Sequence, residues 1–577
     1  MCGICGVVGR VDENLAKRML ASISHRGPDS FDILSISEAS VGGCRLAIVG
    51  SPTAPVPRWD GSTLVLLNGE IYNYPLLAGE MGLGVLDPLD PESDLIGQLL
   101  SRGGWRGLSR LNGMFAVVAL DGESTLLARD RLGIKPLFYA VVGDEVVFGS
   151  EIKAVLAHPA VPTSLDAQAL DETAVFGYIS SPERTPFGAI KQVPPGCVVE
   201  IVRGRIVTHR YWRPAPPRDD GDFSLSEAAD AVRECLWAAL RQTLEHDALP
   251  KGFYLSGGVD SSLLAMIAAE SQAERLLTFT LADSYDAPDL LAARAVAEAI
   301  GADHHEFRVD LDDYLRELPV FVRHYENVIA GGVFDVHGGM AFQLLSRRIS
   351  EYVRVAFSGE GADELFGGYY WSYTHPLGFS DRIRARLNAI GSPTAVAQQV
   401  DALFPQPEDE TVYRRNLFDF LIRGGLSNYH LWSVDRSCSA FGFEVRPAYL
   451  HDDLVDLALS LPIELKVRGS ETKRVLKEAA RPLFARYGLT HLIDRKKSGM
   501  PAAVQGIAGR LETLAGRLVP DAAVAAHPFQ RWVKSPLDAI MFDLFHYIFV
   551  ENRGSLPEGF DVRDFYESGI RADMYRQ

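Results

Sequence analysis

Residues 252–262 read Gly-Phe-Tyr-Leu-Ser-Gly-Gly-Val-Asp-Ser-Ser, a short apolar run followed by a turn rich in glycine and serine. The run predicts a buried strand at 252–255, and the apolar residues after the turn predict a helix over 263–270. Glycine lets a backbone approach a ligand closely, and a helix N-terminus offers unpaired N–H groups to an anion. The turn therefore suits pyrophosphate, although it lacks the Gly-Lys-Ser/Thr of a Walker A loop. A simple tight turn is the alternative.

The neighbouring segments continue this alternation of strand and helix. An amphipathic helix is expected over 224–244, with Ser224 or Ser226 as its cap, and a strand at 277–281 precedes a helix over 289–300. A third strand is expected at 353–357. Strands alternating with helices predict a parallel α/β sheet, and from about residue 380 the pattern is mostly helical.

Acidic residues follow the third strand, in Ser358-Gly-Glu-Gly-Ala-Asp-Glu364. They lie at the carboxyl end of a parallel strand, where ligands of such sheets bind. Carboxylates that face a phosphate loop need a cation between them, and Mg²⁺ prefers oxygen ligands. The two loops together predict a phosphate site that also holds Mg²⁺, and a solvated acidic turn is the alternative.

The first 210 or so residues have a different pattern. Short β-like runs such as 114–120 and 146–148 are separated by turn residues, and a few helical stretches such as 94–101 intervene. This pattern predicts an α+β domain with antiparallel sheets. A polar, Pro-rich stretch follows at 213–221 and is typical of a stiff linker. We therefore expect one domain at 1–212, a linker at 213–223 and a second domain at 224–577.

A cysteine stands second in the chain, in Met1-Cys2-Gly3-Ile4-Cys5-Gly6. If Met1 is removed, Cys2 carries both a thiol and a free α-amine, whose pKa is about 8. Such an amine can act as the general base for its own thiol. A chance terminal cysteine is the alternative. Half of a zinc site or a redox pair with Cys5 is disfavoured, because no second CxxC or HxxxH completes it.

Composition excludes several classes of protein. The chain has 577 residues, too many for a single core, and its net charge of -18 argues against nucleic acid as a partner. Six cysteines without a repeated spacing argue against a disulfide scaffold. We find no signal-peptide pattern and no run of about 18 apolar residues that would span a membrane. The expected compartment is a reducing cytoplasm.

Several motifs resemble those of a known family. Its N-terminal part resembles class II glutamine amidotransferases of the N-terminal-nucleophile fold, in Cys2–Gly6, His25-Arg-Gly-Pro-Asp29, Asn68-Gly-Glu-Ile-Tyr-Asn73 and Arg129-Asp-Arg-Leu-Gly-Ile-Lys-Pro-Leu137. The two loops at 256–262 and 358–369 are similar to those of the ATP-pyrophosphatase (PP-loop) synthetase domain. Over nearly its whole length, the chain resembles the glutamine-hydrolysing asparagine synthetases. The resemblance implies a carbon–nitrogen ligase that uses glutamine, ATP and Mg²⁺.

The resemblance also implies roles for residues of the first site. Cys2 would attack the glutamine side-chain amide, and Asn68 with the Gly69 N–H would form the oxyanion hole. Arg45 matches the residue that pairs with the glutamine α-carboxylate. Glu70 and Asp94 match the acids that hold its α-ammonium group. Ordinary surface charge is the alternative for each of these three.

In the second domain, the resemblance implies an ATP site and a metal site. The ATP-binding residues would be Leu255, Ser256, Gly257, Gly258, Asp260, Ser261, Ser262, Leu281, Ser358 and Gly359. Asp260 and Asp363 would bind Mg²⁺, and Glu360, Asp363 and Lys473 would be catalytic. A carboxylate would be activated as its acyl-AMP and then attacked by ammonia, which would arrive through an internal channel.

Three stretches depart from the pattern of asparagine synthetases. Residues 326–339 are glycine-rich and apolar and contain no Arg or Lys, where an aspartate acceptor would need a cation. Glu444–His451 has Pro447 and Ala448, with His451 in place of Asp, and 496–501 carries an altered basic loop. These departures reflect either ordinary drift or a changed acceptor.

Asparagine synthesis from aspartate is the default expectation. Amidation of another carboxylic acid in natural-product biosynthesis is the alternative, and glutaminase activity alone stays open. The expected partners are glutamine and the acceptor acid, with no nucleic acid or membrane, and a homodimer is a possible assembly.

Overall fold

The structure is a computed structural model of the chain. It describes residues 2–36, 38–59, 62–122, 124–214, 224–272, 274–328, 336–404, 410–495, 504–567 and 571. Most of the predicted linker at 213–223, residues 329–335 of the divergent stretch and the loop at 496–501 lie outside the described residues. Among the described residues, no helix has both the length and the apolar character needed to cross a membrane.

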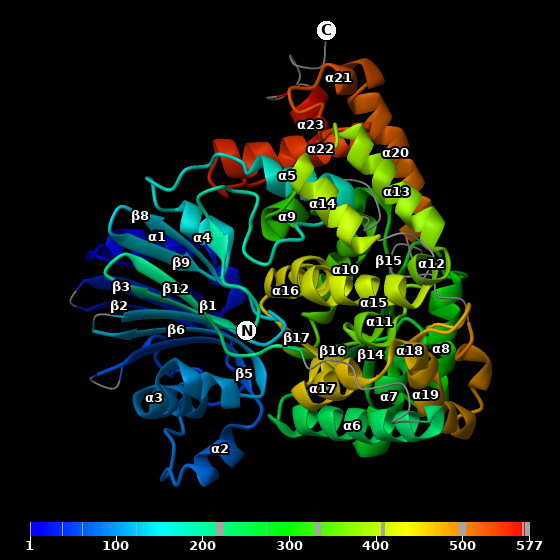
Figure 1. The fold of residues 1–577 in the computed structure, drawn as a ribbon, viewed down its shortest axis with the longest axis horizontal. Helices are drawn as coiled ribbons and strands as arrows, with labels where there is room; N and C mark the ends of the chain where they lie inside the picture. Colours follow the sequence, from blue (N-terminus) through cyan, green and yellow to red (C-terminus); the bar gives the residue numbers. More distant parts are fainter. Residues whose placement is uncertain are drawn as a thin grey trace.

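Two six-stranded antiparallel sheets form the first part of the chain (Figure 1). Their strand orders are β10-β8-β9-β1-β3-β2 and β12-β11-β7-β6-β5-β4. The strands are β1 (Gly3–Val8), β2 (Ser30–Ile36), β3 (Ala39–Arg45), β4 (Arg58–Trp59), β5 (Leu64–Ile71), β6 (Gly113–Asp121), β7 (Ser124–Arg129), β8 (Phe138–Val142), β9 (Glu145–Gly149), β10 (Lys191–Gln192), β11 (Cys197–Val202) and β12 (Arg205–Arg210).

The two sheets share a core of alternate apolar side chains. Ile4, Val41 and Phe148 from the first sheet belong to one buried cluster with Leu66 and Val118 from the second. Helices α1 (Glu13–Ser22) and α4 (Ile152–Leu156) contact strands of the first sheet, whereas α3 (Pro91–Gly103) contacts β5 of the second. This arrangement confirms the predicted α+β class with antiparallel sheets.

A five-stranded sheet lies in the second part, in the order β15-β14-β13-β16-β17. Its strands are β13 (Lys251–Tyr254), β14 (Leu277–Ala282), β15 (Asp303–Arg308), β16 (Val355–Ser358) and β17 (Glu444–Pro447). Every pairing is parallel, which confirms the predicted parallel α/β sheet. The chain passes from β13 outward to β15 and returns to β16, so the strand order reverses between β13 and β16.

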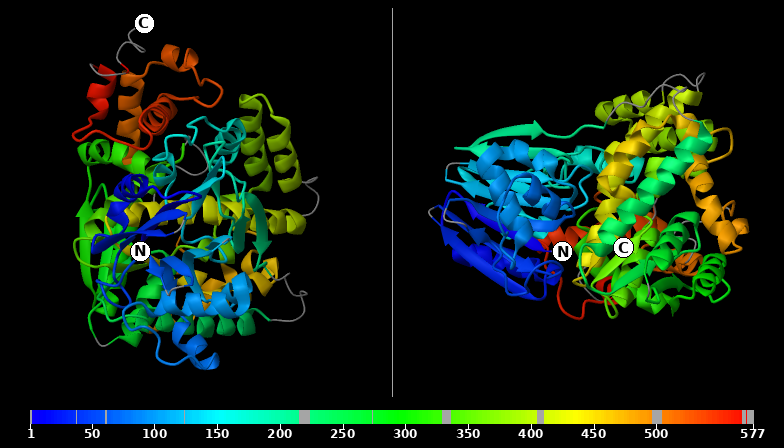
Figure 2. Two further views of the ribbon diagram at one scale, coloured as in Figure 1. Left: turned by 90° about the vertical axis from the view of Figure 1, so that its left-hand side faces the viewer. Right: turned by 90° about the horizontal axis from the view of Figure 1, so that it is seen from below.

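Many helices surround this sheet and extend to the end of the chain (Figures 1 and 2). The remaining α-helices are α2 (Tyr74–Glu80), α5 (Ala167–Phe176), α6 (Leu225–Glu245), α7 (Val259–Ser271), α8 (Pro288–Ile300), α9 (Leu311–Tyr325), α10 (Val336–Ile349), α11 (Ala362–Phe366), α12 (Tyr370–Thr374), α13 (Pro376–Ala389), α14 (Thr394–Leu403), α15 (Glu410–Phe420), α16 (Trp432–Ser439), α17 (Asp452–Ser460), α18 (Ile463–Lys466), α19 (Arg474–Arg486), α20 (Gln505–Leu518), α21 (Asp521–Ala525), α22 (Pro536–Phe545) and α23 (Val562–Glu567). Short 3-10 and π-helical segments are η1 (Ser24–Arg26), η2 (Gly104–Arg110), η3 (Leu421–Leu431), η4 (Ala448–Leu450), η5 (Thr490–Leu492) and η7 (His546–Glu551).

The starts of two helices, α6 and α7, can be compared directly with the sequence predictions. Ser224 caps α6 with a full capping box, in which Glu227 bonds back to the Ser224 backbone, so the predicted cap is correct. The predicted start of α7 at residue 263 is wrong, because the helix begins at Val259. Asp260, Ser261 and Ser262 therefore belong to its first turn, and the loop predicted to bind phosphate is shorter than the motif suggests.

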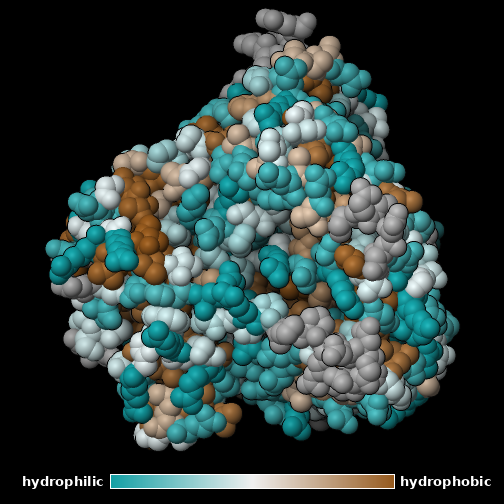
Figure 3. All heavy atoms as spheres, viewed as in Figure 1, coloured by the Kyte–Doolittle hydropathy of each residue, from teal (hydrophilic) through white to brown (hydrophobic). Residues whose placement is uncertain are grey.

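The two parts, called here the amidotransferase half (2–212) and the synthetase half (224–571) after the resemblance of their motifs, pack side by side in Figure 1 and in the right-hand view of Figure 2. The face seen in Figure 3 is mostly hydrophilic, with a strip of apolar atoms at the left over the amidotransferase half. Ion pairs are buried where the halves meet. Arg26 Nη1 lies 2.8 Å from Glu151 and 2.9 Å from Asp435, which is on α16.

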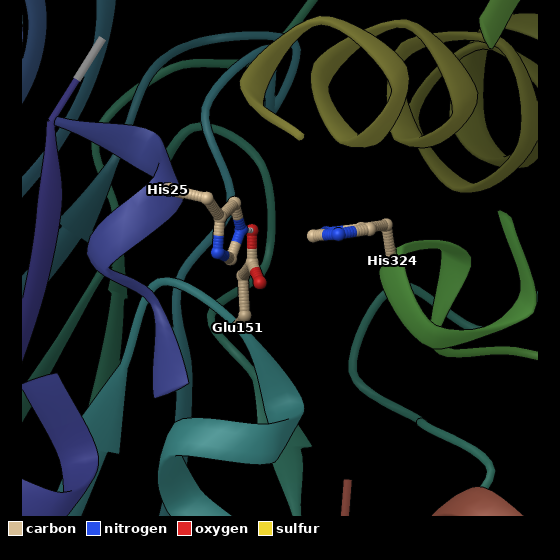
Figure 4. Close-up of side chains that lie close together, drawn as sticks. All are labelled: His25, Glu151 and His324. Carbon is tan, nitrogen blue, oxygen red and sulfur yellow. Dashed lines mark hydrogen bonds and ion pairs between the residues drawn. The ribbon is translucent and has the colours of Figure 1, made fainter. Parts of the chain in front are cut away.

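A histidine pair lies beside these ion pairs (Figure 4). His25 and Glu151 of the amidotransferase half face His324 of α9, and the two imidazole rings meet edge to face at 4.4 Å. Burial lowers the pKa of His25 to about 4 and holds the pKa of His324 well below its usual range, so both rings are neutral at physiological pH. Glu151 already pairs with Arg26 and Lys153, which disfavours binding of a further cation here.

Candidate active sites

Cys2 lies at the head of β1 beside Asn68 of β5. Its backbone nitrogen donates a hydrogen bond to Asn68 Oδ1 at 3.1 Å. Asn68 is completely buried, and among the described residues its Nδ2 has no hydrogen-bond partner. A buried amide donor left open beside a thiol is suited to an oxyanion that forms during attack.

Gly69 follows Asn68 and adopts a φ of 149°. A Cβ at this position would lie 2.0 Å from the Met114 carbonyl oxygen of β6, so a side chain would force the two strands apart. Glycine is therefore required for the backbone to pass Cys2 in this conformation. The structure thus brings together the three residues predicted for the first catalytic centre.

A small cavity opens next to Cys2. It is lined by Cys2, Arg45, Leu46, Ile48, Val49, Pro55, Val56, Arg58, Val65, Leu67, Gly69, Glu70, Asp90, Glu92 and Ser93. Arg45 donates to the Val49 carbonyl at 2.8 Å, and its Nη1 lies 3.8 Å from Asp90. The Arg45 Nε has no partner among the described residues, which leaves one donor free for a ligand.

The acidic side of this cavity differs in part from the expectation. Glu70 lines it, but Asp94 is absent from its wall, because its carboxylate binds Arg58 at 3.1 Å and accepts from the Asp87 N–H at 2.9 Å. Glu92, from the same first turn of α3, faces the cavity instead and accepts from the Ile71 N–H at 2.6 Å. The sequence analysis did not identify Glu92. Its position two residues before Asp94 is a signal that could have indicated it.

Charge in the cavity is set by burial. Burial raises the pKa of the Cys2 thiol, and nearby Arg45 opposes this only partly, so the thiol stays protonated until a base removes its proton. Burial and the neighbouring Glu70 raise the pKa of Glu92 to about 7. His246, the residue after α6, lies 3.0 Å from Glu70 and 3.3 Å from Glu92, and no local motif pointed to it.

The second site is a cavity of about 570 Å³ at the carboxyl ends of β13 and β16. This is the point where the strand order reverses, the usual ligand position in an open parallel sheet. Eleven of the predicted residues line it: Leu255, Ser256, Gly258, Asp260, Ser261, Leu281, Ser358, Gly359, Glu360, Asp363 and Lys473. They come from four separate stretches of the chain.

Gly257 and Ser262 do not line this cavity. Gly257 has a φ of 68°, and a Cβ there would lie 2.4 Å from Ala292 Cβ, so it allows the turn to pack against α8. Ser262 is completely buried in α7, and its N–H bonds to the Gly258 carbonyl at 3.0 Å. Both positions have a structural reason that does not require ATP.

Lys473 joins the two acidic residues of the second site. Its Nζ lies 2.5 Å from Asp260 and 2.6 Å from Asp363, and all three side chains are mostly buried. Asp260 Oδ1 has no hydrogen-bond partner among the described residues. Two carboxylates that converge on a cavity, one with a free oxygen, suit Mg²⁺ as a ligand pair.

Glu360, at the rim of the cavity, has partners that the sequence did not indicate. His430 of η3 lies 3.6 Å from Glu360 through Nδ1 and 3.2 Å from Glu364 through Nε2. The Tyr369 hydroxyl lies 2.6 Å from His430 Nε2 and donates to Glu364. Burial lowers the pKa of His430, but the two carboxylates outweigh burial and raise it.

A third, small cavity lies where the two halves meet. Its wall includes Tyr72, Met114 and Ile134 of the amidotransferase half and Pro447 and Leu450 of the synthetase half. Tyr72 lies near the first site, since its ring contacts that of His246 at 5.1 Å. Leu450 touches the acidic loop of the second site, because a Cβ at Gly361 would lie 2.2 Å from it.

Comparison with known families covers both parts of the chain. Residues 231–535 match the sequence model of asparagine synthase, and residues 1–212 match that of a glutamine amidotransferase domain. The chain belongs to the asparagine synthase family. This result confirms the predicted class of enzyme, a glutamine-dependent carbon–nitrogen ligase.

Relatives of this asparagine synthase family member match it over most of their length. "Asparagine synthetase [glutamine-hydrolyzing] 3" of Bacillus subtilis is 30% identical, covering 86% of this chain and 87% of the relative. "Asparagine synthetase [glutamine-hydrolyzing] 1" of the same organism is 26% identical, covering 88% and 87%. A solved glutamine phosphoribosylpyrophosphate amidotransferase from B. subtilis is 16% identical, covers 62% of this chain and 82% of that one, and has a TM-score of 0.29.

Proposed function

We propose that the chain is an ATP-dependent amidotransferase that hydrolyses glutamine at Cys2 and uses the ammonia to convert an acyl-adenylate into an amide. The observation that carries this proposal is the second cavity. Residues predicted from separate motifs line it together, at the point of the parallel sheet where ligands bind. The proposed domains are those expected from the sequence, 1–212 and 224–577.

The Cys2 step follows from its contacts. Removal of Met1 turns the nitrogen that contacts Asn68 into a free α-amine, which takes the thiol proton as sulfur attacks the glutamine amide carbon. Asn68 Nδ2 and the Gly69 N–H stabilise the negative oxygen. The C–N bond then breaks, the amine returns the proton to the leaving nitrogen, and water releases glutamate from the sulfur.

Glutamine recognition needs one fixed cation and fixed anions for a zwitterion. Arg45, with its free Nε, serves the α-carboxylate. Glu70 serves the α-ammonium group. Glu92 lines the cavity beside Glu70 and is added to this role, while Asp94 contributes through Arg58, which also lines the cavity.

The synthetase half activates the acceptor acid. Its carboxylate oxygen attacks the α-phosphorus of ATP, the bond between the α- and β-phosphates breaks, and pyrophosphate leaves toward Ser256–Ser261 and the N-terminus of α7. Ammonia then attacks the acyl carbon, AMP leaves with the C–O bond electrons, and Glu360 takes the proton that the new amide nitrogen loses.

Mg²⁺ fits the carboxylates of Asp260 and Asp363. When bound, Mg²⁺ neutralises charge on the phosphate oxygens. Lys473 adds a positive charge at the same place, since it lies between both carboxylates. The third cavity supports a route for ammonia from Cys2 to the acyl-adenylate, because residues of both halves form its wall.

Aspartate is the default acceptor, and the product is then asparagine. One observation supports the alternative, a different carboxylic acid. The three cations among the described residues that line the cavity each have an acidic partner: Lys473 with Asp260 and Asp363, Lys477 with Asp494, and Arg495 with Asp289. Tyr254, Phe342 and Leu345 form an apolar wall nearby, which suits an acid with an apolar side chain.

An acceptor screen tests this proposal. The full chain is incubated with ATP, Mg²⁺, glutamine and one carboxylic acid at a time, beginning with aspartate, and AMP, glutamate and amide are quantified. Equal amounts of AMP and amide with one acid support the proposal and identify the acceptor. Glutamate release without AMP from any acid would leave only a glutaminase.

The cytoplasmic location and the homodimer that the sequence analysis expects stay predictions.

A further inference from the structure

Two acidic residues that line the cavity next to Cys2, Glu70 and Glu92, contact a histidine from the other half of the molecule. His246 follows α6 of the synthetase half, yet its Nε2 lies 3.0 Å from Glu70 Oε2 and 3.3 Å from Glu92 Oε1. The rings of Tyr72 and Tyr74 face it edge-on at 5.1 and 6.0 Å. The His246 side chain is only 3% exposed, and these residues of the amidotransferase half lie against it.

The charges around His246 explain what this contact does. Two buried carboxylates side by side repel each other, and one of them would take up a proton. Burial lowers the pKa of His246, but its hydrogen bonds to Glu70 and Glu92 outweigh burial and raise the pKa to about 9. His246 is therefore a cation at neutral pH, and it offsets part of the negative charge of Glu70 and Glu92.

Other charged groups near this cluster are already committed. Arg446 of β17 lies 3.8 Å from Glu70, but its closer partners are Asp247 at 2.7 Å and Glu444 at 3.1 Å. Lys251 pairs with Asp247 at 2.7 Å and does not line the glutamine cavity. Among the described residues, His246 is thus the cation that directly contacts both Glu70 and Glu92.

The same short segment leads to the ATP site. Asp247 follows His246 and binds Arg446 and Lys251, and Lys251 begins β13. β13 ends at Tyr254, directly before the loop that lines the second cavity. A shift of this strand or of α6 would therefore move the cation that holds Glu70.

We propose that His246 is a positioning residue of the glutamine site, supplied by the synthetase half, which holds Glu70 and Glu92 in place to receive the α-ammonium group of glutamine. This inference rests on the proposed function, in which Glu70 binds that group. It makes glutamine affinity depend on the docking of α6 against the amidotransferase half.

Paired substitutions on α6 and at its end test the inference. His246→Ala removes the cation, whereas Gln242→Ala removes another contact across the same interface, the hydrogen bond from Gln242 to the Tyr72 carbonyl at 3.2 Å. For His246→Ala we expect KM for glutamine in glutamate release to rise about tenfold, with kcat within about twofold, because ground-state contacts are lost. Gln242→Ala should keep the wild-type KM, and both variants should keep ammonia-dependent AMP formation.

His246→Gln, which keeps one donor without the charge, should give a smaller rise in KM. If His246→Ala does not fold, His246→Gln tests the inference in its place. A wild-type KM in both His246 variants, or an equal rise in Gln242→Ala, would overturn the inference. Absence of glutamate release by the wild-type chain would contradict the proposed function itself, which separates the two failures.

Discussion

Burial gives the Glu92 carboxyl an unusual pKa, and its effect on glutamine binding can be measured. Its carboxyl is enclosed beside Glu70, and its pKa is raised to about 7. Below pH 7 it becomes protonated, and the cavity loses a negative charge that attracts the α-ammonium group. Above pH 7 that charge is present. Glutamine should therefore bind more weakly as pH falls through 7.

Binding is best measured without turnover, by calorimetry on the Cys2→Ala variant between pH 6 and pH 8. We expect the Kd for glutamine to rise severalfold from pH 8 to pH 6, since one nearby charge is worth about tenfold in favourable cases. Glu92→Gln should flatten this dependence. A slope that persists in Glu92→Gln would assign the titration to another group.

Lys473 gives the second prediction at this scale. Its side-chain amine lies between Asp260 and Asp363 in the second cavity. Cys2 belongs to the other cavity, in the other half of the chain. Lys473→Met keeps the length of the side chain and removes the charge. We expect AMP formation to fall by at least about 10²-fold, as for other groups that stabilise charge on transferred phosphates.

Glutamate release from glutamine should stay within about twofold in Lys473→Met. Lys534→Met, at an exposed site where the side-chain amine donates to the Gln530 carbonyl, is the matched control and should behave as wild type. Equal loss of both activities in Lys473→Met would argue against separate sites.

At the scale of elements, the end of α9 anchors a helix of the other half. Glu326 accepts hydrogen bonds from the backbone N–H groups of Ile152 at 2.8 Å and Lys153 at 2.9 Å, at the start of α4. It also lies 3.2 Å from Lys153 Nζ and from Arg436. This carboxylate thus caps a helix and pairs with two cations, all of them buried.

Glu326→Ala should lower the free energy of unfolding by about 3 kcal/mol, because it removes one acidic partner from two buried cations and the acceptor from two N–H groups. The melting temperature should fall accordingly. Glu13→Ala removes an exposed acid that pairs with Lys17 and should change stability by less than about 1 kcal/mol. A melting temperature in Glu326→Ala equal to that of Glu13→Ala would contradict the anchoring role.

Local patterns predicted the elements that carry buried, periodic side chains. The strands around 114–120, 146–148, 252–255, 277–281 and 353–357 are present as β6, β9, β13, β14 and β16. β15 and β17 were missed, because Asp303–Arg308 and Glu444–Pro447 are rich in charged residues and lie at the two edges of the sheet. An edge strand lacks the apolar run that marks a central one.

Motifs likewise predicted the residues that lie near each other in the chain. Asn68 with Gly69, and Asp260 with Ser261, could be predicted because each pair is adjacent in one short motif. Glu92, His246 and His430 were not found, since their roles depend on contacts with distant segments. His246, for example, meets Glu70 only after the two halves have packed together.

For the whole molecule, the third cavity predicts that ammonia passes between the halves. Ile134 is a partly buried wall residue on a loop, so a larger side chain there can narrow the cavity with little effect on either sheet. Ile134→Trp should raise the ratio of glutamate released to amide formed severalfold. The rate with external ammonium should stay within about twofold.

Ile206→Trp, on the exposed face of β12, is the matched control and should keep the wild-type ratio. A wild-type ratio in Ile134→Trp would mean that ammonia takes another path.

Transfer of the glutamine nitrogen to an acid at the expense of ATP is the central claim. The most direct measurement uses glutamine labelled with ¹⁵N in its amide, together with ATP, Mg²⁺, the acceptor acid and an excess of unlabelled ammonium, and follows the amide by mass spectrometry. The account predicts ¹⁵N in the amide well above its share of the total ammonium, with one AMP for each amide. In Cys2→Ala the product should be unlabelled, while AMP and amide still form. Labelled glutamine that yields glutamate and free ¹⁵N-ammonium, with no AMP and no amide, would contradict the account.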